Sequence, residues 1–175
     1  MKKIIALGGS NSKNSINKQL ASFAANQSGL AATIIDLNDF EMPLYGIDLE
    51  NDEGIPQKAH EFLNLIKEND GVIVSLAEHN GAYSAAFKNI YDWVSRIDGK
   101  LWSDKPMLLM ATSPGGRGGQ TVLEIAADRF PRMGANVIAT YSLPSFGQNF
   151  SEEGIADEDL NKKFSSALQA FKAAL

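Results

Sequence analysis

Three short loops rich in serine, glycine and asparagine carry the residues of this sequence that are suited to chemistry. The first loop runs over Gly8–Asn17, the second over Ala77–Tyr83 and the third over Ser113–Gly119. None of them contains a convincing pair of acid and base side chains. They therefore predict the binding of a ligand that brings its own chemistry, with the protein supplying position and electronics.

The first loop has the composition of a phosphate site built almost without charge. Its hydroxyls stand just before and inside a predicted helix start, where backbone N–H groups and the helix dipole favour an anion. It matches neither the dinucleotide motif G-x-G-x-x-G nor the nucleotide motif G-x-x-x-x-G-K-[ST]. The alternative is a plain polar turn in which Ser15 caps the helix. The residues in question are Ser10, Ser12, Ser15, Ile16 and Asn17.

The second and third loops each allow two interpretations. Glu78 is either a general base or a carboxylate that caps a neighbouring helix, and His79 is interpreted as a surface residue. Asn80-Gly81 is a turn signal in any protein. The four glycines around Arg117 either let a planar ligand lie against bare backbone or form a flexible surface loop. Each loop is weak evidence alone, and their joint placement is stronger.

The elements that position these loops alternate between strand and helix. Short apolar runs predict five buried parallel strands, at Lys3–Leu7, Ala32–Leu37, Gly71–Leu76, Pro106–Thr112 and Asn136–Leu143. Helical periodicity between and after them predicts five helices, at Ser15–Gly29, Pro56–Asn69, Ser84–Ile97, Gly119–Met133 and Asp157–Leu175.

Five such units predict an α/β fold with a doubly wound parallel sheet in the order 2-1-3-4-5 and helices on both faces. Strands 1, 3 and 4 are then central, and the three loops follow these strands. Ligands of such sheets bind beyond the carboxyl ends of the strands, where the strand order reverses. The longest stretch expected to be irregular is Asn38–Ile55.

Composition excludes several classes of protein. The 175 residues are expected to form one domain, 1–175, and a net charge of −5 argues against a nucleic-acid or anionic-membrane partner. No cysteine is present, which excludes disulfides, thiolate metal sites and cysteine nucleophiles, and two histidines are too few for a histidine-rich metal site. No apolar stretch is long enough for a membrane helix or a signal peptide. We expect a cytoplasmic protein.

The motifs in these loops resemble those of the NADPH-dependent FMN reductase family, flavodoxin-like enzymes that include quinone, azo-dye and chromate reductases. The family motif G-S-x-R-x-x-S-x-N is similar to Gly9–Asn17, with Ser12 at the position of the arginine. The family motif T-P-E-Y-N-G is similar to Leu76–Gly81, with Ala77 for proline and His79 for tyrosine. Ser113–Gly119 is similar to the third loop of the family, and the likeness covers nearly the whole chain.

This resemblance implies a flavodoxin-like FMN-dependent oxidoreductase that takes hydride from NAD(P)H and passes electrons to a small acceptor in a ping-pong cycle. It places the FMN phosphate on the first loop and the flavin ring between the second and third loops. Arg117 is a candidate for holding the phosphates of NAD(P)H. The implied cofactor-binding residues are Ser10, Ser12, Ser15, Ile16, Asn17, Ala77, Glu78, His79, Asn80, Gly81, Ser113, Pro114, Gly115 and Gly116.

The family also implies a homodimer or homotetramer, with the helix at Ser84–Ile97 near the interface. Tyr91 and Trp93 widen the apolar surface of that helix, so they either serve the interface or flank the core. A non-catalytic flavodoxin-like electron carrier for a redox protein is the alternative function. A response-regulator receiver and a low-molecular-weight phosphatase are rejected, because the acidic residues of the first and the cysteine of the second are missing.

Overall fold

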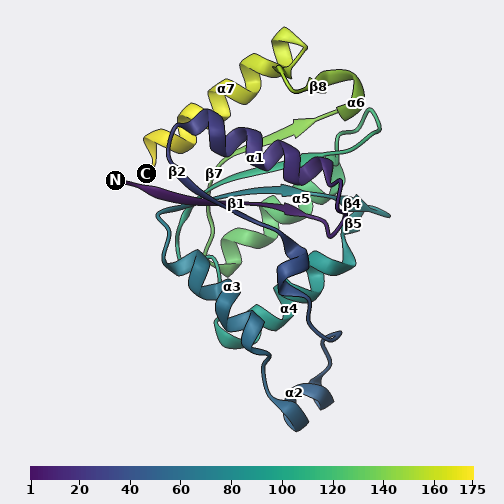
Figure 1. Ribbon diagram of the computed structural model, residues 1–175, viewed down its shortest axis with the longest axis vertical. Coiled ribbons are helices and arrows are strands. Elements are labelled where there is room, and N and C mark those ends of the chain that lie inside the picture. The colour runs from purple at the N-terminus through teal and green to yellow at the C-terminus, as the bar shows by residue number, and fades with distance from the viewer.

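A five-stranded parallel sheet forms the centre of the computed structural model, which describes residues 1–175 (Figure 1). The strand order is β2-β1-β3-β6-β7, and all four neighbouring pairs are parallel. The predicted order 2-1-3-4-5 and the doubly wound α/β class are therefore confirmed. The strands are β1 (Lys3–Gly9), β2 (Ala31–Ile35), β3 (Gly71–Leu76), β6 (Pro106–Thr112) and β7 (Asn136–Leu143).

Helices cover both faces of the sheet, as the apolar pattern predicts (Figure 1). One face carries α1 (Ile16–Ser28) and α7 (Glu158–Ala173), and the other carries α3 (Gln57–Lys67), α4 (Ala85–Ile97) and α5 (Gln120–Arg129). Neighbouring residues of β1 alternate between the two apolar clusters, because successive side chains of a strand point to opposite faces. None of the helices combines the length and hydropathy needed to cross a membrane.

Helix ends follow the capping chemistry of the sequence. The hydroxyls of Ser15 and Ser84 accept the N–H groups of Lys18 and Phe87, so both serines cap their helices. The predicted helix over Gly119–Met133 is too long. α5 ends at Arg129 and continues as the 3-10 helix η2 (Phe130–Met133), since a proline near the start of that segment has no N–H for an α-helical bond.

An arm over Leu37–Ile55 leaves the second strand and projects from the body of the molecule (Figure 1). It contains η1 (Leu37–Phe40) and α2 (Ile47–Glu53), and α2 has no buried residue. The expectation of an irregular stretch is thus wrong for α2. The sequence lacks an apolar stripe there because this helix packs mainly through one partly buried residue, Leu49, and is tied to α4 by the ion pair of Glu50 with Arg96.

Tyr91 and Trp93 of α4 are core residues and not surface residues. They are 7% and 0% exposed, and the indole N–H of Trp93 donates to the carbonyl of Pro43 at 2.8 Å. The interpretation that they supply an oligomer interface is therefore wrong. Trp93 packs α4 against the base of the arm, and Tyr91 packs against Trp102 and Phe130.

Several short elements gather in the loops of the sheet. They are β4 (Glu78–His79), β5 (Ala82–Tyr83), α6 (Phe146–Asn149), β8 (Phe150–Ser151) and β9 (Gly154–Ile155). β4 and β5 form an antiparallel hairpin directly after the second loop begins. Elements of two to four residues carry no periodicity, so the sequence pattern does not reveal them.

We expect Gly8→Ala to lower the free energy of unfolding by at least about 2 kcal/mol, as overpacking does in cores. A Cβ at Gly8 would lie 2.6 Å from the Cα of Lys18 and 2.8 Å from the carbonyl carbon of Asn17, so α1 would have to move off β1. Denaturant unfolding measures the loss. Gly99→Ala is the control, since no atom lies within 4 Å of its added Cβ. Equal stability of the two variants would contradict the close approach.

Candidate cofactor site

A cavity of about 330 Å³ lies at the carboxyl edge of the sheet, where β1, β3 and β6 end. All three sequence loops contribute to it, so they meet as predicted. Its volume is within the usual range for small-molecule sites. The residues that line it are Ser10, Ser12, Asn14, Ser15, Ile16, Asn17, Ala77, Glu78, His79, Thr112, Ser113 and Pro114.

Ten of the fifteen predicted site residues are among these, and five are not. Asn80 and Gly81 form the tip of the β4–β5 hairpin, Gly115 continues the third loop, and Gly116 and Arg117 line a different cavity. Thr112 and Asn14 are lining residues that the sequence interpretation missed. The position of Thr112 as the last residue of a central strand is the signal that would have found it.

Hydrogen bonds within the first loop fix its serines in a series of turns. The hydroxyl of Ser10 accepts the N–H of Ser12 at 3.1 Å, and the hydroxyl of Ser12 accepts the N–H of Asn14 at 3.3 Å. The hydroxyl of Ser15 accepts the N–H of Lys18 at 3.1 Å. A serine that accepts in this way keeps its own proton for another partner. Three O–H donors of the loop are therefore available to a ligand.

The start of α1 adds backbone donors to these hydroxyls. The N–H groups of Ile16 and Asn17, in the first turn of the helix, donate to no protein atom. Unpaired N–H groups of a first turn and the positive end of the helix dipole attract anions. The polar-turn interpretation is correct in one respect, because Ser15 does cap the helix. Capping uses its lone pair and leaves the anion-binding donors free.

The side chain of Asn17 is occupied by the protein. Its oxygen accepts the hydroxyl of Ser75 at 2.8 Å and the N–H of Thr112 at 3.0 Å, and its amide donates to the carbonyl of Thr112 at 3.1 Å. Asn17 is 2% exposed. Its backbone N–H is left for a ligand, while the side-chain amide keeps a second N–H but is almost fully buried. Its side chain joins the start of α1 to the ends of β3 and β6.

The second loop is a tight hairpin whose turn needs its asparagine and glycine. Asn80 and Gly81 have φ of 53° and 75°, a conformation in which these two residues are the most favourable pair. Glu78, at the base of the hairpin, accepts the N–H of Val122 at 3.0 Å. Of its two interpretations, the helix cap is the one observed. Glu78 thereby ties the second loop to the start of α5, the helix that follows the third loop.

The third loop is held from behind by the loop after β7. The carbonyls of Ser113 and Gly115 accept the N–H groups of Phe146 and Ser145 at 3.0 and 2.9 Å. Gly118 has a φ of 60°, and a Cβ there would lie 2.8 Å from the nitrogen of Pro144. The loop is therefore packed and not simply flexible. Its exposed N–H groups at Ser113, Gly115 and Gly116 donate to no protein atom.

Charge at the phosphate-binding end of the site comes from dipoles and not from cations. Lys18, on the first turn of α1, pairs with Asp36 at the end of β2. The hydrogen bond from Lys18 is the largest of the effects that hold the pKa of Asp36 below its usual range. Ser12 stands where a cation was expected from the motif. The lining of the cavity therefore offers neutral donors, and no lysine or arginine, to an anion.

The donor set fits the cofactor that the motifs imply. Free N–H groups and hydroxyls converge where a phosphate monoester would lie, and two loops with unpaired backbone N–H groups stand beyond it. The cavity side chains include no cysteine and no acid–base pair, since its one carboxylate is used as a helix cap.

Comparison with known proteins assigns the family. The model of the family described as NADPH-dependent FMN reductase matches residues 2–148. This chain belongs to that family. The suggested resemblance is therefore confirmed, and with it the assignment of FMN as the cofactor and NAD(P)H as the electron donor of an oxidoreductase.

Sequence similarity to individual reductases is consistent with membership of this family. The chain is 29% identical over 121 residues to a quinone reductase of Escherichia coli, which covers 67% of this chain and 63% of that protein. It is 34% identical over 119 residues to a 2-hydroxy-1,4-benzoquinone reductase of Burkholderia sp, covering 66% and 63%. The matched region thus spans less than two thirds of these relatives.

The fold is shared with solved flavoenzymes. The NAD(P)H:(acceptor) oxidoreductase FerB of Paracoccus denitrificans superposes with a TM-score of 0.78 at 23% identity, covering 99% of this chain and 97% of that one. The flavodoxin-like architecture of the FMN reductase family is thereby confirmed.

We expect Ser15→Ala to weaken FMN binding and to lower stability by about 1 kcal/mol through loss of the helix cap. The phosphate would lose one hydroxyl donor, whereas riboflavin, which has no phosphate, should bind the variant and the wild type alike. Calorimetric titration with both ligands separates the two effects. Ser22→Ala, on the same helix outside the cavity, is the control. Unchanged FMN affinity in folded Ser15→Ala would place the phosphate elsewhere.

Proposed function

We propose that this protein transfers hydride from NAD(P)H to a small quinone-type acceptor through FMN held in the three-loop cavity, with residues 1–175 acting as one FMN-binding domain. The observation that carries the proposal is the set of free donors at the start of α1, the backbone N–H groups of Ile16 and Asn17 beside the serine hydroxyls. A flavin phosphate is the anion that such a site suits in this family.

The first loop orients the cofactor. Ser10, Ser12 and Ser15 donate their hydroxyl protons to the phosphate, while Ile16 and Asn17 donate backbone N–H groups. These donors are already fixed by hydrogen bonds inside the loop and by the Asn17 side chain. Little ordering is left for the binding step, so less binding free energy is lost.

The second and third loops hold the flavin ring. FMN supplies the hydride-accepting and hydride-donating chemistry when it is bound. Ala77, Glu78 and His79 border one side of the ring site, and Ser113 and Pro114 border the other. Backbone N–H groups of the third loop stabilise negative charge at the edge of the ring, which is an electrostatic role that needs no acid–base side chain.

The third loop would leave one face of a bound flavin open, so the donor and the acceptor would use the same space in turn. Gly115 and Gly116 of the third loop are exposed, and no atom lies within 4 Å of a Cβ built at Gly116. Planar molecules can therefore approach over bare backbone. The quinone class of acceptor is taken from the names of the relatives in Escherichia coli and Burkholderia sp. The cytoplasm, as a source of NAD(P)H, is the proposed location, and activity confined to a membrane or secreted fraction would contradict it.

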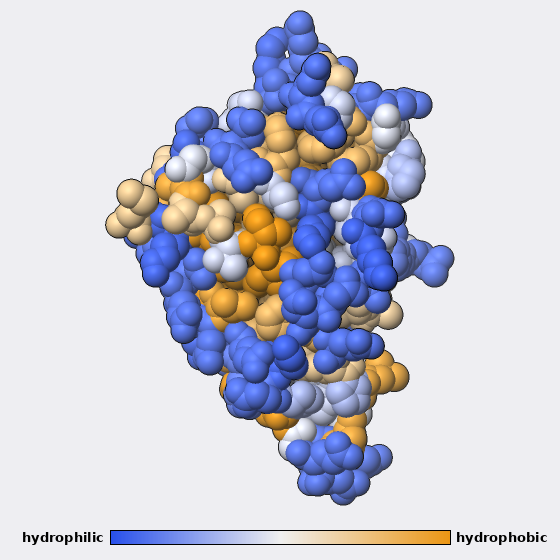
Figure 2. Space-filling model, in the orientation of Figure 1, coloured by the Kyte–Doolittle hydropathy of each residue, from blue (hydrophilic) through white to orange (hydrophobic).

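The proposed enzyme is a homo-oligomer that uses the arm as a contact. Leu44 and Ile47 of the arm are 81% and 53% exposed. Figure 2 shows apolar atoms at the lower end of the molecule, where the arm projects. Large apolar side chains on a projecting segment are typical of a protein–protein contact. The arm, rather than Tyr91 or Trp93, then covers part of a second copy.

Steady-state kinetics test the proposed reaction. With NAD(P)H varied at several concentrations of benzoquinone, we expect parallel double-reciprocal lines, because donor and acceptor cannot occupy one ring face together. Intersecting lines would show that both bind at once. Bound FMN without any oxidation of NAD(P)H would instead favour the non-catalytic electron carrier.

We expect Leu44→Ser/Ile47→Ser to reduce the oligomer to a single chain without unfolding it, since neither residue is buried. Light scattering after size exclusion measures the mass, and circular dichroism checks the fold. Ile125→Ser is the control, because Ile125 is also exposed, at 40%, but lies on α5 away from the arm. An oligomer of unchanged mass would exclude the arm as the contact.

A further inference from the structure

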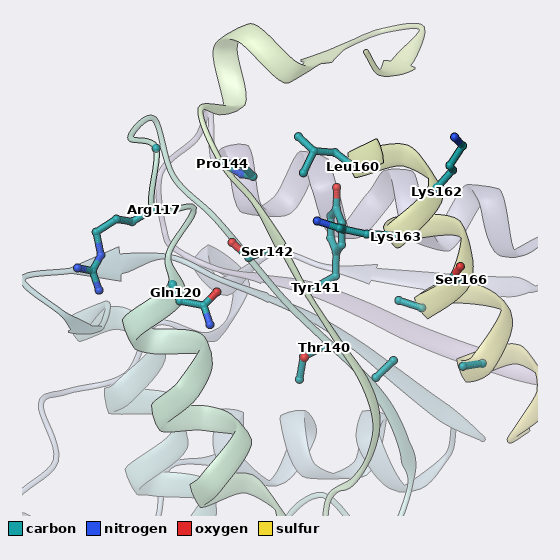
Figure 3. Close-up of a pocket in the computed structure, with 14 residues that line it drawn as sticks. Arg117, Gln120, Thr140, Tyr141, Ser142, Pro144, Leu160, Lys162, Lys163 and Ser166 are labelled. Carbon is teal, nitrogen blue, oxygen red and sulfur yellow. The ribbon is translucent and has the colours of Figure 1, made fainter. Parts of the chain in front are cut away.

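A second, larger groove of about 950 Å³ runs along the outer edge of the sheet (Figure 3). β7 is the last strand in the order, so its outer edge pairs with no strand and forms the floor. Residues of α5 and the third loop form one wall, and residues of α7 form the other. The lining residues are Gly116, Arg117, Gln120, Ala139, Thr140, Tyr141, Ser142, Pro144, Leu160, Lys162, Lys163, Ser166, Ala167 and Ala170.

The lining of the groove is positively charged, although the protein as a whole is acidic. Its lining has three cations, Arg117, Lys162 and Lys163, and no acidic residue, whereas the whole chain has a net charge of −5. Neither Arg117 nor Lys163 pairs with a carboxylate, and Lys162 lies 4.0 Å from the exposed carboxylate of Asp159. Exposed pairs of that length contribute little. The groove is thus complementary to an anionic ligand.

The cations stand on both walls. Figure 3 shows the side chain of Lys163 extending from α7 across the groove above Tyr141, and that of Lys162 pointing outward. Arg117 lies at the opposite wall, where its guanidinium donates to the hydroxyl of Thr121 at 3.1 Å. Lys163 is therefore the cation best placed to contact a ligand lying over β7.

The groove and the cofactor cavity share the third loop as a wall. Ser113 and Pro114 line the cavity, Gly116 and Arg117 line the groove, and only Gly115 separates the two pairs. The hydroxyl of Ser142 on β7 donates to the carbonyl of Gly118 at 3.0 Å and holds this wall in place. The two sites therefore lie on consecutive stretches of one loop, joined by the exposed backbone of Gly115 and Gly116.

We propose that this groove binds the phosphates on the adenosine half of NAD(P)H, with Lys163 as the principal contact, while the nicotinamide reaches the flavin over Gly115 and Gly116. The inference rests on the proposed function, which requires a site for this dinucleotide. The other interpretation of the lysines is that they guard an open strand edge against pairing with another chain.

The first experiment compares three hydride donors. In Lys163→Ala the KM for NADPH should rise by about tenfold, as expected for the loss of one charge-assisted hydrogen bond. The KM for reduced nicotinamide mononucleotide, which lacks the adenosine half, should not change. An equal rise for NADH assigns the contact to the pyrophosphate, and a rise for NADPH alone assigns it to the 2′-phosphate.

The matched control is Lys172→Ala, a lysine of the same helix that does not line the groove. It should leave the KM of all donors unchanged, and the affinity for FMN should be the same in both variants. If the KM for NADPH is unchanged in Lys163→Ala, or if the variant only self-associates, the inference is wrong. The lysines would then serve to prevent the edge strand from pairing with another chain.

A binding measurement separates this inference from the proposed function. Calorimetric titration of the FMN-loaded protein with 2′,5′-ADP should show binding that weakens with added salt and about tenfold in Lys163→Ala. If the protein oxidises NADPH but does not bind 2′,5′-ADP, the assignment of the groove is wrong and the proposed function stands. Binding that depends on Lys163 in a protein that does not oxidise NAD(P)H overturns the proposed function and supports the groove.

Discussion

The buried amide of Asn17 is the interaction on which the rest of the site depends. It bonds Ser75 at the end of β3 and both backbone groups of Thr112 at the end of β6, and it belongs to the first turn of α1. Three separate elements therefore meet at one side chain that is 2% exposed. Since a buried polar group without partners is costly, the amide is satisfied only when all three elements are in register. The phosphate donors at the start of α1 are positioned by this network before any ligand arrives.

The second constraint is that backbone segments of different elements lie in direct contact beside this network, which requires glycine at the points of contact. At Gly8 the backbone of β1 touches that of Lys18, and at Gly118 the third loop touches Pro144. Glu78 adds a bond from the second loop to the start of α5, and Ser84 bonds the carbonyl of Gly9 at 2.7 Å. The three loops are thus cross-linked to one another by side-chain hydrogen bonds. Several residues that make these bonds, Asn17, Glu78 and Thr112 among them, also line the cavity.

Much of this fold could be predicted from the sequence, because buried parallel strands and amphipathic helices have clear hydrophobic patterns. β3, β6 and β7 have their predicted bounds, and the placement of the three loops follows from the strand order. The pattern did not predict α2, which has no buried residue, and it left open whether Trp93 packs in the core, because that depends on the carbonyl of Pro43 far away in the chain. It placed Asn17 at the cavity, which this residue does line, but residue type and position did not reveal that its side chain bonds Ser75 and Thr112.

The two candidate sites differ in how they hold an anion, and this difference suits their two ligands. The cofactor cavity offers neutral donors fixed by hydrogen bonds within the protein, which salt screens less than it screens exposed charges. The outer groove uses exposed lysine and arginine side chains, whose attraction is long-ranged but screened. Exposed cations accelerate encounter and hold the ligand loosely, which suits a donor that must leave after each hydride transfer. The third loop, fixed between the two sites, is where a retained cofactor and an exchanging donor would meet.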